Sequence, residues 1–249
     1  MSSTLELRNP ADDTVTRDVL LCDVADVDRM VEQAQRSFAT WKAMAPNDRV
    51  RTLRRFAQAI ADDAENLARL DTRDMGMPIA SSRWCANTAA EVIHYYAGAV
   101  DKHLGHTYPV ADGVSMTFHE PLGVVGVIIP WNFPVLIAAW KIGPALACGN
   151  TVVLKPSEFT PSSALRLAEL AMAAGLPENV LQVAVGTGDV AGWRLVEHPL
   201  VRKIGFTGST AVGRRILSGS ADSMKRVTLE LGGKSANIVF ADTDVEAVA

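Results

Sequence analysis

The feature of the sequence that most constrains the fold is a regular alternation of short apolar runs and longer helical patterns within residues 122–235. The apolar runs predict strands at 124–129, 151–154, 180–185, 201–206 and 226–229. The segments between them predict helices at 135–147, 162–174, 190–197 and 211–217. Short apolar strands that are joined by helices pair in parallel, and the helices cover both faces of the sheet. The sequence therefore predicts an α/β fold with a doubly wound parallel sheet.

The residues before this sheet follow other patterns. Apolar positions at three- and four-residue steps predict helices over 26–41, 46–75 and 81–103. Residues 1–24 are polar and mixed, and we expect irregular structure there with a short strand at 19–22. Asp112 and Gly113 separate two partly alternating runs, which predicts a β-hairpin over 107–120. Because an isolated hairpin is only marginally stable, we expect it to join another sheet, in this chain or in another subunit.

Charge and cysteine content exclude several classes of function. The formal net charge is −4, which argues against a nucleic-acid or anionic-membrane partner. The longest apolar run, 124–129, is far too short to span a bilayer. Cys22, Cys85 and Cys148 are widely separated and show neither a disulfide framework nor metal-ligand spacing. We therefore expect a cytoplasmic protein without a metal site.

In an open α/β sheet, ligands bind beyond the carboxyl ends of the strands. Asn132 follows the first predicted strand between two prolines, and its amide could donate a hydrogen bond to a developing oxyanion. An Asn that only shapes the turn is the alternative. Lys155 and Glu158 follow the second strand, where an acid can accept ribose hydroxyls and repel a 2′-phosphate. That placement favours NAD over NADP. The alternative is that Lys155 and Glu158 only form an ion pair in a solvated loop.

Two glycine-rich turns are candidates for binding a pyrophosphate. The segment 186–192 resembles a dinucleotide fingerprint, but its last spacing is one residue too long and it follows the third strand. The segment 208–213 follows the fourth strand and opens a helix that Ser209 or Thr210 can cap. Free backbone N–H groups at such a helix start bind anions.

Glu230 ends the last predicted strand, between Leu229 and Leu231 and just before the pair Gly232-Gly233. The leucine neighbours suggest a partly dry setting, which raises the pKa of a carboxylate and suits it to general-base catalysis. A solvated or salt-bridged structural Glu is the alternative on local features alone.

These segments together resemble a known family. The segments 130–134, 155–158, 206–210 and 229–234 occur in the order and spacing of the aldehyde dehydrogenase superfamily, and the likeness extends from about Asn9 to the last residue. The resemblance implies a Rossmann-like cofactor domain and NAD(P)-dependent oxidation of a small-molecule aldehyde to a carboxylic acid. The reaction would pass through a cysteine thiohemiacetal and an acyl-enzyme. It also implies a homo-dimer or tetramer that pairs through the hairpin.

The resemblance also implies a role for each matching residue. Asn132 resembles the side-chain half of the oxyanion hole, and Glu230 resembles the general base that activates the deacylating water. The implied cofactor-binding residues are Ile129, Pro130, Trp131, Lys155, Ser157, Glu158, Gly188, Phe206, Thr207, Gly208, Ser209, Val212, Gly213 and Leu231. Phe133, Ile137 and Trp140 resemble the wall of the aldehyde tunnel, although as a bare pattern they would be core residues. A Glu at position 230 points to acid formation rather than transfer of the acyl group to coenzyme A.

One departure from the family pattern leaves two hypotheses. Members of the family are longer, and their nucleophilic cysteine follows the Glu at a position beyond Ala249. Cys148 is expected at a helix C-terminus, where the helix dipole disfavours a thiolate, and Cys22 and Cys85 are expected far from the carboxyl end of the sheet. The chain is then either the N-terminal half of an NAD-dependent aldehyde dehydrogenase or an inert nucleotide-binding truncation. Either way, we expect residues 1–249 alone to bind NAD weakly at best and to form no NADH.

The expected domain organisation has four parts. Residues 1–106 form the N-terminal helical part of the cofactor-binding domain, and 107–121 form an oligomerisation hairpin. Residues 122–235 form the Rossmann-like NAD-binding core, and 236–249 begin a truncated catalytic domain.

Overall fold

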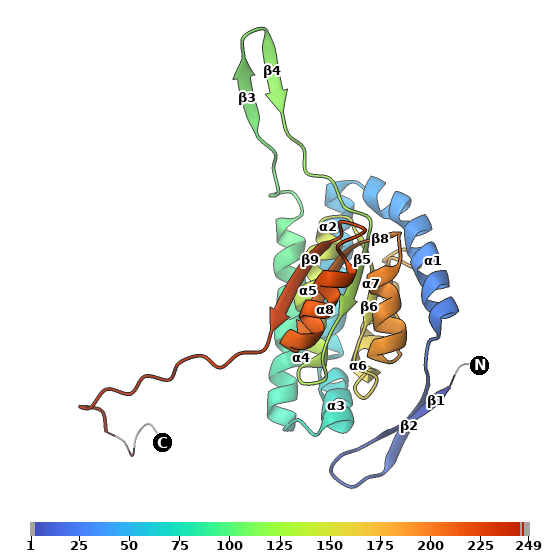
Figure 1. Ribbon diagram of the computed structural model, residues 1–249, viewed down its shortest axis with the longest axis vertical. Helices are drawn as coiled ribbons and strands as arrows, with labels where there is room; N and C mark the ends of the chain where they lie inside the picture. Colours follow the sequence, from blue (N-terminus) through green and yellow to red (C-terminus); the bar gives the residue numbers. More distant parts are fainter. Residues whose placement is uncertain (1–2, 245, 247–249) are drawn as a thin grey trace.

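A five-stranded parallel sheet forms the centre of the molecule in the computed structural model, which describes residues 3–244 and 246 (Figure 1). Its strands are β5 (Val124–Ile128), β6 (Thr151–Lys155), β7 (Leu181–Val183), β8 (Val201–Gly208) and β9 (Arg226–Leu231). Their spatial order is β7-β6-β5-β8-β9, and every pair is parallel. The predicted doubly wound sheet is therefore confirmed, with the strand order reversing between β5 and β8.

Helices cover both faces of this sheet because its inner strands are apolar on both sides. Every residue of β5 and β6 is buried. Val125 and Val127 of β5 enter one core, together with residues of α2, α4, α5 and α6. Val124 and Ile128 enter the second core, with residues of α1, α7 and α8. The near-continuous apolar runs that predicted the strands thus serve two cores at once.

Most of the helices lie at the predicted positions, with shifted ends. The helices are α1 (Val24–Ala43), α2 (Pro46–Asp62), α3 (Ala64–Met75), α4 (Ile79–Ala99), α5 (Pro134–Ala147), α6 (Ser162–Ala173), α7 (Trp193–Glu197) and α8 (Thr210–Gly219). Asp23 caps α1 in a reciprocal capping box with Asp26. The helix predicted at 190–197 is a π-helical turn, η1 (Gly188–Gly192), followed by the short α7.

The prediction of a single helix over 46–75 is wrong, because the helix is interrupted at Asp63. This residue leaves the helical conformation with φ −98° and ψ 8°. Its carboxylate accepts two hydrogen bonds of 2.9 Å from the guanidinium of Arg166 on α6. A contact more than a hundred residues away along the chain therefore accompanies the break between α2 and α3.

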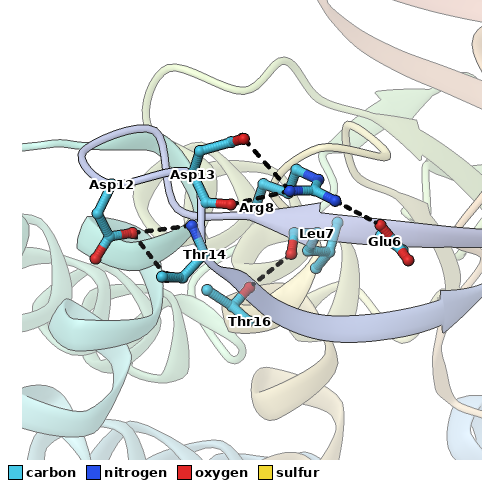
Figure 2. Close-up of polar contacts among 7 residues, drawn as sticks. All are labelled: Glu6, Leu7, Arg8, Asp12, Asp13, Thr14 and Thr16. Atoms are coloured by element: carbon cyan, nitrogen blue, oxygen red, sulfur yellow. Dashed lines mark hydrogen bonds and ion pairs between the residues drawn. The ribbon is translucent and has the colours of Figure 1, made fainter.

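The expectation of irregular structure at 1–24 is also wrong, because β1 (Thr4–Arg8) and β2 (Val15–Leu20) form an antiparallel hairpin. Its turn is held by local polar contacts (Figure 2). Arg8 bonds to the carbonyl oxygen of Asp13 at 3.0 Å, and Asp12 accepts the hydroxyl of Thr14 at 2.7 Å. Asp13 adopts the left-handed conformation that such a turn requires. Few residues of this hairpin are both apolar and buried, Leu7 being one of them, so the sequence shows no clear alternation here.

The predicted hairpin at 107–120 is present, with shorter strands. It consists of β3 (Thr107–Val110) and β4 (Gly113–Met116), which pair antiparallel, and all of their residues are exposed. It projects from the body of the molecule (Figure 1) and pairs with no other strand of the described chain. The expectation that it joins another sheet is therefore not met within this chain.

Residues 232–240 extend from the end of β9 without regular structure, and they are exposed (Figure 1). The expected start of another domain at 236–249 lies partly outside the described residues. No described helix has the length and apolar character that would let it cross a bilayer.

Candidate functional site

The carboxyl ends of the parallel strands bring the predicted segments to one end of the sheet. Ile128 of β5 is in register with Lys155 of β6 and with Phe206 of β8. Phe206 is in turn in register with Leu229 of β9, and Thr207 with Glu230. The loops that leave these strands therefore emerge side by side, on both sides of the point where the strand order reverses.

Asn132 lies in the turn between β5 and α5 and is exposed. The turn starts from a fixed point, because Ile129 is buried and donates its N–H to the carbonyl oxygen of Lys155 at 3.0 Å. Within the described residues, the Asn132 side chain makes no hydrogen bond, so its amide does not hold the turn together. A side-chain hydrogen bond is therefore not what places Asn132 in this turn, and its amide is open to solvent.

Lys155 and Glu158 form an ion pair at the end of β6. The Lys155 ammonium lies 3.0 Å from Oε2 of Glu158, and the side chains are 5 % and 22 % exposed. Ser157 is buried and accepts the N–H of Phe159 at 3.3 Å. The pair is not the solvated surface pair of the alternative interpretation. Instead, a mostly buried cation holds one oxygen of a carboxylate at the rim of the sheet.

The turn between β8 and α8 has the features of an anion site. Ser209 is the N-cap of α8, and its hydroxyl accepts the N–H of Val212 at 3.3 Å. In the described part of the chain, the N–H groups of Thr210 and Ala211 have no acceptor. Such free donors at the positive end of a helix dipole attract phosphate groups.

Two glycines let this turn pack closely. A Cβ at Gly208 would lie 2.5 Å from the ring of Phe206, and a Cβ at Gly213 would lie 2.5 Å from the side chain of Leu231. A larger residue at Gly213 would push α8 away from β9, and one at Gly208 would displace the ring of Phe206. Phe206 is buried, whereas Val212 and Leu231 are partly exposed beside the turn.

The competing glycine-rich turn at 186–192 is occupied by contacts with the rest of the protein. A Cβ at Gly186 would lie 2.6 Å from Ala191 and 3.1 Å from the carbonyl oxygen of Cys22. Gly188 is exposed, and next to it Asp189 pairs with Arg215 of α8 at 2.8 Å. The carboxylate of Asp189 disfavours a phosphate at this turn, which agrees with the helix start at Ser209 as the better anion site.

The partly dry environment expected for Glu230 is wrong for the described structure. Glu230 is exposed, and its neighbours Leu229 and Leu231 are only partly buried. The reason is topological, since β9 is an edge strand of the sheet and pairs only with β8. Glu230 is therefore open to solvent at this side of the sheet.

Lys141 on α5 is a candidate that the sequence analysis missed. Its ammonium donates to the carbonyl oxygen of Phe206 at 3.4 Å. Burial lowers the pKa of Lys141, and the negative charge of Glu230 partly offsets that effect. Lys141 therefore joins α5 to β8, within electrostatic range of Glu230 on β9. The available signal was that it is the only charged residue in the helix 134–147.

The three residues predicted to line the aldehyde tunnel differ in their exposure. Phe133 at the N-cap of α5 is 38 % exposed and Trp140 is 52 % exposed, but Ile137 between them is only 4 % exposed. Ile137 belongs to the core, as its bare pattern suggested, while the two aromatic rings are free to contact a ligand.

None of the three thiols lies where a thiolate is favoured. Cys148 at the C-cap of α5 is exposed, yet partial desolvation raises its pKa and Arg49 only partly offsets this, while burial raises the pKa of Cys85 to about 11. Cys22 lies closer to the carboxyl end of the sheet than expected, because its N–H donates to the carbonyl oxygen of Val185 just after β7. Burial and the charges of Asp26 and Asp23 raise the pKa of Cys22 as well. A thiol in its protonated form is a poor nucleophile.

Two hollows in the described surface lie away from the candidate site. One is lined by residues such as Arg69 and Arg83 and the other by residues such as Arg29 and Gln182, and neither includes a predicted site residue. Among the described residues, no group of three or more His, Cys, Asp or Glu side chains is placed to hold a metal ion.

The fold and the site together define a doubly wound α/β protein whose ligand-binding loops lie at the carboxyl end of the sheet. A model of the aldehyde dehydrogenase family matches residues 1–249. The chain belongs to the aldehyde dehydrogenase family.

Individual relatives support this assignment. The chain is 47 % identical over 256 residues to phenylacetaldehyde dehydrogenase of Pseudomonas fluorescens, covering 99 % of this chain and 51 % of the relative. It is similar to PnpE of Pseudomonas sp. WBC-3 in complex with nicotinamide adenine dinucleotide, with 44 % identity and a TM-score of 0.95 over 98 % of this chain and 51 % of that one.

The NAD+ complex of an aldehyde dehydrogenase from Bacillus cereus is also similar, with 41 % identity and a TM-score of 0.95 over 98 % of this chain and 50 % of that one. The chain therefore spans about half the length of these relatives.

Proposed function

We propose that this chain is the NAD-binding part of an enzyme that oxidises an aldehyde to a carboxylic acid. The observation that carries the proposal is the convergence of four segments, with Asn132, Glu158, Ser209 and Glu230 among their residues, at the carboxyl end of one parallel sheet. Structural relatives solved with NAD support the choice of cofactor.

The residues at this end of the sheet fit NAD. The free N–H groups at the start of α8 suit the pyrophosphate, and Gly208 leaves room for close approach of the backbone. The carboxylate of Glu158, fixed by Lys155, suits the hydroxyls of the adenosine ribose. It would repel a 2′-phosphate, so we propose NAD rather than NADP.

NAD would supply the acceptor for the hydride that the aldehyde carbon loses. We propose that the amide of Asn132 donates to the substrate oxygen as negative charge develops on it. Glu230 would take a proton from the water that releases the acid. Its exposure in the described structure leaves it accessible to water.

We propose that the attacking thiol is not one of the three cysteines of this chain. Cys148 lies at the C-cap of α5, where the helix dipole disfavours a thiolate, Cys85 is fully buried, and Cys22 lies beside the end of β7 near two acids. The activity would then belong to a longer protein. The same observation supports a second candidate function, a nucleotide-binding module that catalyses nothing. In both cases, the hairpin of β3 and β4 would pair with a second copy, and the protein would be cytoplasmic.

We further propose the four-part organisation of the chain, with 1–106 and 122–235 sharing one cofactor domain. The packing of α2 and α4 in the same core as β5 and β6 supports this division.

An NADH assay distinguishes the two candidate functions. We expect protein purified from its natural source to form NADH from NAD and aliphatic or aromatic aldehydes, and to have a mass well above 26.7 kDa. The recombinant 249-residue chain should form none and should bind NAD weakly at best. A natural product of this mass that binds NAD without turnover would establish the inert module. If the isolated chain turns over and Cys148→Ala abolishes that turnover, the proposal that none of the three cysteines attacks the aldehyde would be overturned.

Cofactor preference tests the role of Glu158. We expect Glu158→Ser to raise the affinity for NADP relative to NAD by about tenfold or more, because it removes both a ribose acceptor and a negative charge. The measurement is a titration of each nucleotide, monitored by tryptophan fluorescence. Glu169→Ser is the matched control, since Glu169 pairs with Arg166 on the surface of α6. An unaltered NAD to NADP ratio in Glu158→Ser would argue against the ribose assignment.

A further inference from the structure

The start of α5 lacks a cap of its own. Phe133 occupies the N-cap position and has no side-chain acceptor, and Pro134 at the first helical position has no N–H. The first free donor of the helix is therefore the N–H of Val135. This donor lies only three residues after Asn132, so whatever binds it also fixes the turn that carries Asn132.

The acceptor for this donor comes from α3. Oδ2 of Asp71 accepts the N–H of Val135 at 3.4 Å, although the two residues are 64 positions apart in the sequence. Asp71 is only 1 % exposed. The hydroxyl of Ser163 on α6 lies near the same carboxyl without forming a hydrogen bond of good geometry. The carboxyl group thus supplies the missing cap of α5 from a buried position.

A second acid one turn later on α3 does the same for the next helix. Asp74 accepts both the N–H and the hydroxyl of Ser162, each at 3.0 Å, at the first residue of α6. The N-cap of α6 is Pro161, which provides no side-chain acceptor either. Since α5 and α6 follow β5 and β6, α3 fixes two of the loops at the carboxyl end of the sheet, and each acid serves one loop.

Keeping Asp71 buried is costly to the fold. Its pKa is raised to about 7, chiefly by burial and also by the charge of Asp74, while Ser163 and the N–H of Val135 act in the opposite direction. On the neighbouring α4, Asp71 contributes to the raised pKa of Cys85. An apolar side chain at this position would avoid the desolvation. The benefit of the carboxyl group therefore lies in its placement, not in its burial.

We infer that Asp71 is a positioning residue for the Asn132 turn: through Val135 it holds the first turn of α5 and so sets where the Asn132 amide points. The structural part of this inference stands alone, and its catalytic consequence rests on the proposed function. Asp74 is assigned the equivalent role for the loop that carries Lys155 and Glu158.

Hydrogen exchange of the 249-residue chain, measured by mass spectrometry, tests the structural part. Asp71→Leu fills the same space without an acceptor, and we expect exchange of the amides at 131–137 to rise by about tenfold, the effect of a lost helix cap. Asp71→Asn keeps an acceptor oxygen and should restore protection. Asp74→Leu is the matched control and should raise exchange at 160–166 but not at 131–137. If Asp71→Leu does not fold, Asp71→Ala replaces it in the same comparison.

Unchanged exchange at 131–137 in Asp71→Leu, or an equal rise in both segments in both variants, would overturn the inference. The catalytic part is tested in the full-length dehydrogenase. There Asp71→Leu should lower kcat by about tenfold with an unchanged KM for NAD, and Asp71→Asn should recover it. A rise in exchange at 131–137 without a change in kcat would reject the catalytic role of Asp71. Absence of turnover in the unaltered protein would instead reject the proposed function and leave the exchange result standing.

Discussion

Replacing Asn132 by Ala is expected to lower kcat for aldehyde oxidation by about 10²- to 10³-fold in the full-length enzyme that carries this chain. The amide is the donor that we assign to the developing oxyanion, and a donor that acts mainly in the transition state affects kcat more than substrate affinity. The measurement is steady-state formation of NADH with saturating NAD.

The structure predicts that this loss is not caused by unfolding. Asn132 is exposed and its side chain makes no hydrogen bond within the described residues, so Asn132→Ala should leave the thermal midpoint unchanged. Asn150→Ala is the informative control. Asn150 accepts the N–H groups of Leu122 and Gly123 and donates to the carbonyl oxygen of Ala145, so its loss should lower stability instead. Equal turnover in Asn132→Ala and the unaltered enzyme would remove Asn132 from the oxyanion site.

Replacing Glu230 by Gln is expected to separate the two halves of the reaction. The variant should form about one equivalent of NADH per active site in a rapid burst, and its steady-state rate should then fall by about 10²- to 10⁴-fold. The reason is that Gln keeps the shape of the side chain but cannot take the proton from the deacylating water. Rapid-mixing measurement of NADH absorbance distinguishes the burst from the steady state.

Glu230 suits this test because it is exposed at the end of the outermost strand, so the substitution should not alter stability. Glu197→Gln serves as the matched control, since Glu197 accepts the indole N–H of Trp193 at 2.6 Å on α7. It should show neither a burst nor a slower steady state. Steady-state turnover that is unchanged in Glu230→Gln would exclude Glu230 as the deacylation base.

Several of these features were present in the sequence because they depend on near neighbours. The apolar runs of β5 and β6 predicted buried parallel strands, since each run is long enough for one strand and is bounded by turn residues. The Pro130–Pro134 turn, the acid at Glu158 and the helix start at Ser209 followed from local turn and cap chemistry. The family resemblance added their roles, which remain proposals.

Other features depended on contacts that only the folded chain creates. The sequence shows neither the break at Asp63 nor the packing of Cys22 at the end of β7, because Arg166 and Val185 lie far away along the chain. The two leucines beside Glu230 suggested a dry site, but the position of β9 at the side of the sheet exposes all three residues at least in part.

The sequence by itself determined the parallel α/β sheet, the positions of the four loops and the family, because periodicity, turn chemistry and motif order are local properties of the chain. Only the tertiary structure decided which side chains fix those loops. Asp71 and Asp74 are two acids in an amphipathic helix until α3 packs against the starts of α5 and α6. Hydrogen bonds between residues some 60 to 90 positions apart exist only after the core has formed, and no pattern within either segment predicts them.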